Sequence, residues 1–215
     1  MSEKTESLRK IKEEVISLQS SPLYEERKKN KVFPVIGEGD HDAEIMFVGE
    51  APGAREAATG RPFCGSAGTI LTEMIESADL KREDVYITNI LKDRPPNNRD
   101  PLPEEIEMYA PFLDRQIEII QPKVIAPLGR FAAKYILEKY EIRLEPFSIS
   151  KIHGIIYNTK DGNLLIIPLQ HPAVAVYNPS RKEELKKGFE SLRRSSFKKE
   201  KEVIESESKK EQSNQ

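Results

Sequence analysis

Three polar side chains that could contact a small ligand stand at the ends of apolar runs. Glu50 follows the run AEIMFVG, Asn89 ends the run VYITN, and His171 follows LLIIPLQ. Short apolar runs of this kind are typical of buried strands. Because the carboxyl ends of parallel strands meet at one edge of a sheet, we expect the three side chains to share a crevice. The ligand could be a free nucleotide, a phosphate or a base within DNA.

The loop after the first run supplies the other candidate groups. Residues 48–71 read VGEAPGAREAATGRPFCGSAGTIL and contain a second carboxylate, Glu56, and an aromatic ring, Phe63. No Gly-Lys-Ser/Thr follows its glycines, so the loop does not match a phosphate-binding P-loop. Each residue also has a structural interpretation. Asn89 could cap a loop, His171 could stabilise a turn, Phe63 could be core and Glu56 could be a solvated charge.

Strand-like and helix-like patterns alternate along the chain that must position these groups. Strands are expected at 44–48, 85–91, 123–128 and 163–169, the last forming a hairpin with 151–159. Residues 21–40 are expected to be a loop with one short extended piece. Helices are expected at 1–20, 67–78, 103–120, 130–140 and from Ser180, where Glu183 would complete a capping box. This alternation predicts an α/β fold with a mostly parallel sheet.

The length and the charge distribution of the chain limit its domain organisation and its partners. The 215 residues suit one domain, 1–195, with an amphipathic helix at 1–20 and a charged tail at 196–215 that we expect to be disordered. Residues 32–180 carry 15 Lys/Arg against 22 Asp/Glu, so local basic sites would have to hold a polyanion. No secretory pattern or apolar run of membrane length is present, which predicts a soluble intracellular protein.

Four segments together closely resemble the family 4 uracil-DNA glycosylases. They are the loop at 48–71, YITNILKDRPPNNRDPLPEEIE at 86–107, APLG at 126–129 and HPAVAVYNPSR at 171–181. The resemblance runs from about Gly37 to Leu192 in the family's order. It implies a three-layer α/β/α sandwich around a four-stranded parallel sheet, in agreement with the alternating pattern. It also implies a monofunctional enzyme of base excision repair that flips uracil out of DNA and hydrolyses its N-glycosidic bond, leaving an abasic site.

The resemblance assigns roles to the candidate residues. Phe63 would stack on the base, Asn89 would pair with uracil N3–H and O4, and His171 would donate to O2. The backbone around Gly49, Glu50 and Ala51 would frame the base and the sugar. Glu50 or Glu56 would hold the attacking water, and the sequence does not separate the two. Glu56 could alternatively occupy the space of the thymine methyl group.

The resemblance also indicates how DNA would be held. The HPAVAVYNPSR segment would enter the minor groove, with Val174 and Val176 as the wedge that unstacks a base step. Phosphate contacts would come from Arg94, Arg99, Arg181 and Lys182, and further contacts from Lys186 and Lys187, unless these two only form a solvated face.

Family members usually bind a [4Fe–4S] cluster through four cysteines, and this chain lacks all four. Asp93 and Tyr109 occupy two of the ligand positions, and no cysteine lies in residues 1–63. Because Asp and Tyr do not replace thiolates in such clusters, we predict a protein without cluster or other metal. We expect Tyr109, Pro22, Leu23 and Tyr24 to fill the space. The single cysteine, Cys64, is expected to act as a small buried hydrophobic residue.

Two other functions stay open at this point. One is a catalytically silent binder of damaged or single-stranded DNA, and the other is a glycosylase whose preference has shifted to hypoxanthine or xanthine. The presence of Phe63, Asn89 and His171 favours the uracil enzyme. By analogy with the family we expect a monomer in the cytoplasm of a prokaryote, associated with the nucleoid. A sliding-clamp partner is plausible by the same analogy, although the tail contains no convincing clamp-binding peptide.

Overall fold

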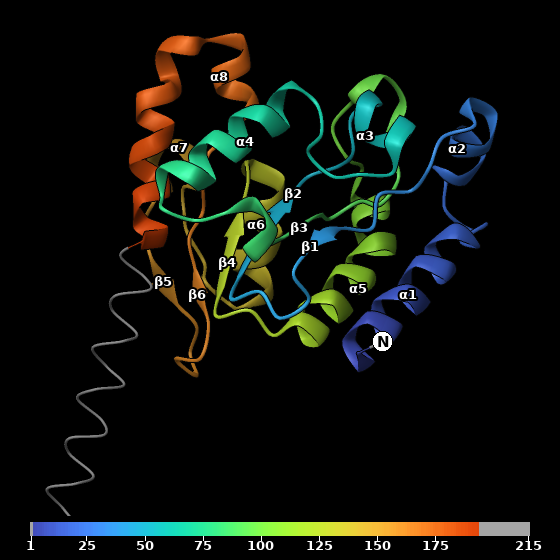
Figure 1. Ribbon diagram of the computed structural model, residues 1–215, viewed down its shortest axis with the longest axis horizontal. Helices are drawn as coiled ribbons and strands as arrows, with labels where there is room; N and C mark the ends of the chain where they lie inside the picture. Colours follow the sequence, from blue (N-terminus) through green and yellow to red (C-terminus); the bar gives the residue numbers. More distant parts are fainter. Residues whose placement is uncertain (1, 194–215) are drawn as a thin grey trace, which may run out of the picture.

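A six-stranded sheet forms the centre of the computed structural model, which describes residues 2–193 (Figure 1). The strand order is β1-β3-β2-β4-β6-β5. The four inner strands are parallel: β2 (Ile45–Gly49), β3 (Tyr86–Asn89), β4 (Val124–Pro127) and β6 (Leu165–Ile166). This confirms the predicted parallel core. The edge strands β1 (Glu38–Gly39) and β5 (Tyr157–Asn158) are antiparallel to their neighbours and extend the sheet on both sides.

Helices cover both faces of the sheet, which confirms the three predicted layers (Figure 1). Alternate residues of β2 point to opposite faces. Met46 and Val48 join the core beneath α1 (Glu3–Ile16), α5 (Pro103–Ile120), α6 (Arg130–Lys139) and α7 (Ile149–Ile152). Ile45 and Phe47 join the core beneath α4 (Ser66–Ser77), α8 (Ala173–Tyr177) and a final helix at 182–193. Among the described residues, no helix has the length and apolar content needed to span a membrane.

The parallel register brings the ends of three strands to one edge. Gly49 of β2 lies beside Asn89 of β3. Beyond β4 and β6, an isolated parallel bridge joins Leu128 to Leu169, two residues before His171. The segments that carry Glu50, Asn89 and His171 therefore leave the sheet at the same edge, as the strand-end argument predicted.

Two short helices lie in segments where the sequence predicted only loop. α2 (Tyr24–Asn30) forms within the stretch 21–40, and α3 (Ala54–Thr59) forms within the glycine-containing loop. In α2 the charged run contains a buried side chain, Arg27, whose partners come from distant parts of the chain. Two 3₁₀ turns, η1 (Arg82–Asp84) and η2 (Pro96–Asn98), complete the connections around β3.

The hairpin and the last helix begin later than the sequence predicted. Only β5 pairs with β6, because α7 occupies residues 149–152 and buries Ile152 in the core. Before the last helix, Asn178 and not Ser180 is the cap. Its side-chain oxygen accepts from the Ser180 N–H at 3.2 Å, and the turn η3 (Pro179–Arg181) follows. The proposed domain end at 195 and the tail at 196–215 lie outside the described residues.

Candidate active site

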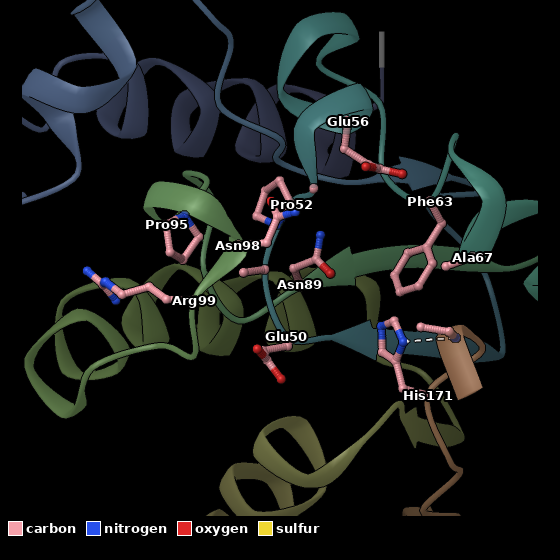
Figure 2. Close-up of a pocket in the computed structure, with 13 residues that line it drawn as sticks. Glu50, Pro52, Glu56, Phe63, Ala67, Asn89, Pro95, Asn98, Arg99 and His171 are labelled. Carbon is pink, nitrogen blue, oxygen red and sulfur yellow. Dashed lines mark hydrogen bonds between the residues drawn. The ribbon is translucent and has the colours of Figure 1, made fainter. Parts of the chain in front are cut away.

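A pocket of about 220 Å³ opens at the carboxyl edge of β2 and β3 (Figure 2). This volume is below the roughly 300–1,000 Å³ typical of sites for drug-sized ligands and suits a single small ring. It is lined by Glu50, Ala51, Pro52, Gly53, Glu56, Phe63, Ala67, Asn89, Pro95, Asn98, Arg99, His171 and Ala173. We call this cavity the base pocket. It brings together every residue predicted to contact uracil except Gly49, which packs beneath it.

Asn89 contributes a buried side-chain atom without a hydrogen-bond partner. Its residue is 1% exposed, and among the described residues its Oδ1 alone is a buried side-chain N or O atom without a hydrogen-bond partner. The amide points into the base pocket (Figure 2). Gly49 makes this placement possible, because a Cβ there would lie 2.3 Å from Asn89 Oδ1 and 2.7 Å from the Phe63 ring. An unpaired buried acceptor costs about 1–3 kcal/mol, so the pocket is built for a ligand that donates a hydrogen bond.

Phe63 forms a wall of the base pocket from an unusual backbone conformation. Its φ is 46°, in the left-handed region that bulky residues rarely adopt. The backbone that follows is held by Glu56, whose Oε1 accepts from the N–H groups of Cys64 at 3.0 Å and Gly65 at 2.8 Å. The Phe63 ring lies 5.6 Å from the His171 ring, between centroids, at an interplanar angle of 34°. The strained loop thus presents an aromatic surface beside the imidazole.

His171 is a neutral hydrogen-bond donor. Its Nδ1 accepts from the Ala173 N–H at 3.2 Å, the dashed line in Figure 2, so the ring proton is assigned to Nε2. Burial lowers the pKa of His171 to about 4, and the nearby Glu56 carboxylate only partly opposes this effect. The imidazole therefore stays uncharged near neutral pH and can donate from Nε2 to an oxygen in the pocket.

The two glutamates of the base pocket differ in their surroundings. Burial, assisted by Asp100, raises the pKa of Glu50 to about 7, while Arg130 acts in the opposite direction. A carboxylate that titrates near neutral pH is suited to act as a general base. Glu56 already accepts two backbone hydrogen bonds. Figure 2 shows the two carboxylates on opposite sides of Asn89.

Arg94 and Arg99, predicted to contact phosphates, make contacts within the protein. Arg99 lines the base pocket, and its Nη1 lies 2.9 Å from Oε2 of the fully buried Glu105. Arg94 donates from Nε to Asn98 Oδ1 at 2.7 Å. Both side chains stabilise the loop between β3 and α5.

Arg181 and Lys182 are also paired with neighbouring residues. Arg181 donates to Glu184 at 3.1 Å and to Gln170 Oε1 at 2.7 Å, and Lys182 forms an ion pair with Glu73. These residues can bind phosphate only if DNA competes with or shares these partners. The pairs therefore lower the net positive charge available for DNA on this side of the pocket.

The helix α8 presents one residue that the sequence reasoning missed. Val174, one of the two predicted wedge residues, is partly buried against the core on the α4 side of the sheet. Val176 is 38% exposed, and the neighbouring Tyr177 is 88% exposed. An aromatic residue directly before the Asn-Pro turn was a signal that could have singled out Tyr177.

A buried polar network occupies the region where the family's cluster cysteines would lie. Arg27 Nη1 and Asp93 Oδ2 are 2.9 Å apart, Tyr109 donates to Asp93 Oδ2 at 2.6 Å, and the Ser21 and Tyr109 hydroxyls are 2.7 Å apart. Arg27 also donates to the carbonyls of Val15 and Ile16 at 3.0 and 2.5 Å. We call Ser21, Arg27, Asp93 and Tyr109 the N-terminal network, because it joins α1 and α2 to the core.

The N-terminal network does not fit an iron–sulfur cluster. Its Asp93 carboxylate is occupied by Arg27 and Tyr109, and it contains no thiolate. In the described part of the chain, no group of three or more His, Cys, Asp or Glu could hold a metal ion. Of the predicted fillers, Tyr109 and Leu23 are buried, whereas Pro22 is exposed, so that part of the packing prediction was wrong.

Comparisons with known proteins identify the family of this chain. Residues 36–193 match the family model described as the uracil DNA glycosylase superfamily. A type-4 uracil-DNA glycosylase of Sulfurisphaera tokodaii is 48% identical over 191 residues, covering 87% of this chain and 84% of the relative. One of Archaeoglobus fulgidus is 46% identical, covering 87% and 92%. A type-5 uracil-DNA glycosylase of Thermus thermophilus is 33% identical, covering 62% and 66%. With the matched region spanning the whole base pocket, the chain belongs to the type-4 uracil-DNA glycosylases.

Proposed function

We propose that this protein is a uracil-DNA glycosylase, a hydrolase that removes uracil from DNA and leaves an abasic site. The observation that carries this function is the unpartnered Oδ1 of Asn89, a residue that lines a pocket of single-ring size together with Phe63 and His171. The relatives named as type-4 uracil-DNA glycosylases support the same activity. Enzymes of this kind extrude the nucleotide from the duplex before they read the base.

The base pocket can read uracil by hydrogen bonding and stacking. Uracil N3–H would donate to Asn89 Oδ1, and Asn89 Nδ2 would donate to uracil O4. Cytosine carries an acceptor at N3 and an amino group at position 4, so it presents the opposite pattern to the same amide. Phe63 offers its ring for stacking on the base.

Hydrolysis requires that the negative charge on the departing base is stabilised and that a water molecule is held in position to attack C1′. As the C1′–N1 bond breaks, its electron pair moves to uracil, and His171 Nε2–H would donate to O2, where negative charge develops. The water oxygen would bond to C1′ and pass a proton to Glu50. We assign this role to Glu50 because its pKa of about 7 suits a base, whereas Glu56 is committed to the Phe63 loop.

DNA would approach the open side of the base pocket. We propose Val176, with the exposed Tyr177 beside it, as the wedge on α8. Arg94, Arg99, Arg181 and Lys182 stay predicted phosphate ligands that would have to share or exchange their present partners. A single domain over residues 1–195, a monomeric state, association with the nucleoid and a sliding-clamp partner also stay predictions.

We further propose that the protein works without an iron–sulfur cluster. The supporting argument is the donor chemistry of the N-terminal network, in which hydrogen bonds and one ion pair take the place of thiolate ligation. This network would carry out the joining role that a cluster performs between the start of the chain and the core.

Strand cleavage of uracil-containing oligonucleotides tests the function. We expect the folded protein to convert a uracil-containing duplex into a product that alkali cleaves at the uracil position, with no cleavage of thymine or cytosine controls. Parallel hypoxanthine and xanthine substrates measure the base range. Preferential cleavage of either would support the shifted-preference alternative. Binding of the uracil duplex by folded protein without cleavage would support the silent binder and contradict the proposed enzyme.

A further inference from the structure

A lysine lies fully buried directly behind the base-reading residue. Lys92 is 0% exposed, and its Nζ donates to Asn89 O at 2.7 Å, to Thr88 Oγ1 at 2.8 Å and to Gln116 Oε1 at 2.5 Å. All three acceptors are uncharged, and no acidic side chain of the described residues pairs with Nζ. A buried charge without a counter-ion is costly to the fold, and a methionine could fill the same space without that cost. The lysine therefore calls for a functional explanation.

The hydrogen bonds around Lys92 favour its ammonium form. Thr88 has one hydroxyl hydrogen, for which the Ile36 carbonyl at 2.7 Å and Gln116 Oε1 at 3.2 Å are acceptors, so Thr88 Oγ1 is left to accept from Lys92. The carbonyl of Asn89 and the amide oxygen of Gln116 are acceptors as well. Three acceptors need three N–H donors, which only the ammonium supplies. Burial lowers the pKa of Lys92 well below its ordinary value. Hydrogen bonds from Nζ to three acceptors favour the charged form and oppose this effect.

The partners of Lys92 are themselves fixed. Gln116 on α5 donates from Nε2 to the Ile36 carbonyl at 2.9 Å and to the Tyr86 hydroxyl at 3.2 Å. The peptide that follows Asn89 is held as well, because Ile90 N–H donates to the Gly49 carbonyl at 3.0 Å. The backbone of Asn89 is thus fixed on both sides, and the hydrogen-bonding need that stays unmet lies on its side chain.

We infer that Lys92 is a positioning residue of the base pocket, which holds the Asn89 amide in place through the Asn89 carbonyl. This inference rests on the proposed function. In that function the Asn89 amide would read the N3–O4 edge of uracil, so a small shift of the Asn89 backbone would misplace both of its hydrogen bonds to the base.

A double-mutant cycle on the single-turnover rate with uracil-containing duplex tests this inference. We expect K92M to lower the rate about 100-fold, the loss that a small misplacement of a reacting partner can cause. In the N89A background, K92M should cost less than about threefold, because Lys92 acts through Asn89. Affinity for abasic-site DNA should not change. Y109F is the matched control: it removes a buried hydroxyl contact outside the base pocket and should leave the rate unchanged.

Equal losses from K92M in the two backgrounds, or a loss below about threefold in folded K92M, would overturn the inference. If K92M does not unfold cooperatively, the cycle is carried out with T88V in its place. T88V removes one acceptor of the ammonium while preserving the shape of the side chain. We expect about a tenfold loss for T88V in the wild-type background and none in N89A. Equal T88V losses in both would likewise overturn the inference. A folded wild-type protein that leaves uracil uncleaved would refute the proposed function itself, a result distinct from any outcome of the cycle.

Discussion

The base pocket and the N-terminal network are both clusters of polar side chains inside the fold, yet they differ in completeness. In the N-terminal network, Arg27, Asp93, Tyr109 and Ser21 satisfy one another at 2.6–2.9 Å. In the base pocket, Asn89 Oδ1 has no partner, and burial displaces the pKa of the Glu50 carboxyl to about 7. Both clusters are desolvated, so desolvation alone does not mark a functional site.

The difference indicates what each cluster does. A satisfied buried network stabilises the folded chain, and removing one member leaves its partners unpaired. A cluster with unmet hydrogen-bonding capacity costs stability until a ligand completes it. We therefore expect substitutions in the base pocket to lower activity with little effect on stability, and substitutions in the N-terminal network to do the reverse.

The largest effect is expected for N89A. Loss of the amide should lower the single-turnover rate on uracil by about 1,000-fold, the upper range for removal of one transition-state contact. The free energy of unfolding should stay within about 1 kcal/mol, because the substitution also removes an unsatisfied acceptor. Rapid-quench kinetics and chemical denaturation measure the two quantities. A large loss of stability in N89A would remove the contrast with the N-terminal network.

The reciprocal result is expected for R27M. Removing the partner of the buried Asp93 should lower the free energy of unfolding by about 3 kcal/mol, which corresponds to a decrease in Tm of about 6–12 °C for a chain of this size. The uracil cleavage rate, measured well below the Tm, should not change. Anaerobically purified wild-type protein should also lack visible iron–sulfur absorbance. Such absorbance, or an unchanged Tm in R27M, would contradict the stabilising role of this network.

The base pocket was more predictable from the sequence than the N-terminal network. Glu50, Asn89 and His171 each follow an apolar run, and the topology of a parallel sheet brings such positions to one edge. Arg27 lies in the charged run EERKK and carries no local sign that it is buried. Its partner Asp93 is 66 residues away, and only the packing of α2 against the core brings them together.

The separate roles of the two glutamates also depended on tertiary structure. The sequence placed Glu50 and Glu56 in one loop and left both as candidates for holding the water. Their difference arises from burial, from the charges of Asp100 and Arg130, and from the backbone N–H groups of Cys64 and Gly65. The left-handed φ of Phe63 likewise could not be predicted from the residue type, since bulky residues avoid that region.

A smaller effect, visible in its pH dependence, is expected for E50Q. With a pKa of about 7, Glu50 is protonated in acid and becomes a base as the pH rises, so the wild-type rate should increase up to about pH 7 and then level. E50Q should lower the plateau about 100-fold and remove this pH dependence. His171 cannot produce it, because its pKa of about 4 keeps the ring neutral throughout.

The matched control is E56Q, whose amide oxygen can still accept from the Cys64 and Gly65 N–H groups, and it should keep the pH dependence.

Stability gives a second readout of E50Q, with the opposite sign. Because folding raises the pKa of Glu50, the folded state binds the proton more tightly, and the wild type loses stability as the pH rises from about 4.5 to 7. E50Q carries no charge at this position, so above pH 7 it should have the higher Tm while cleaving more slowly. If E56Q instead abolished the pH dependence and E50Q kept it, Glu56 would hold the water, and Glu50 would lose the role assigned to it.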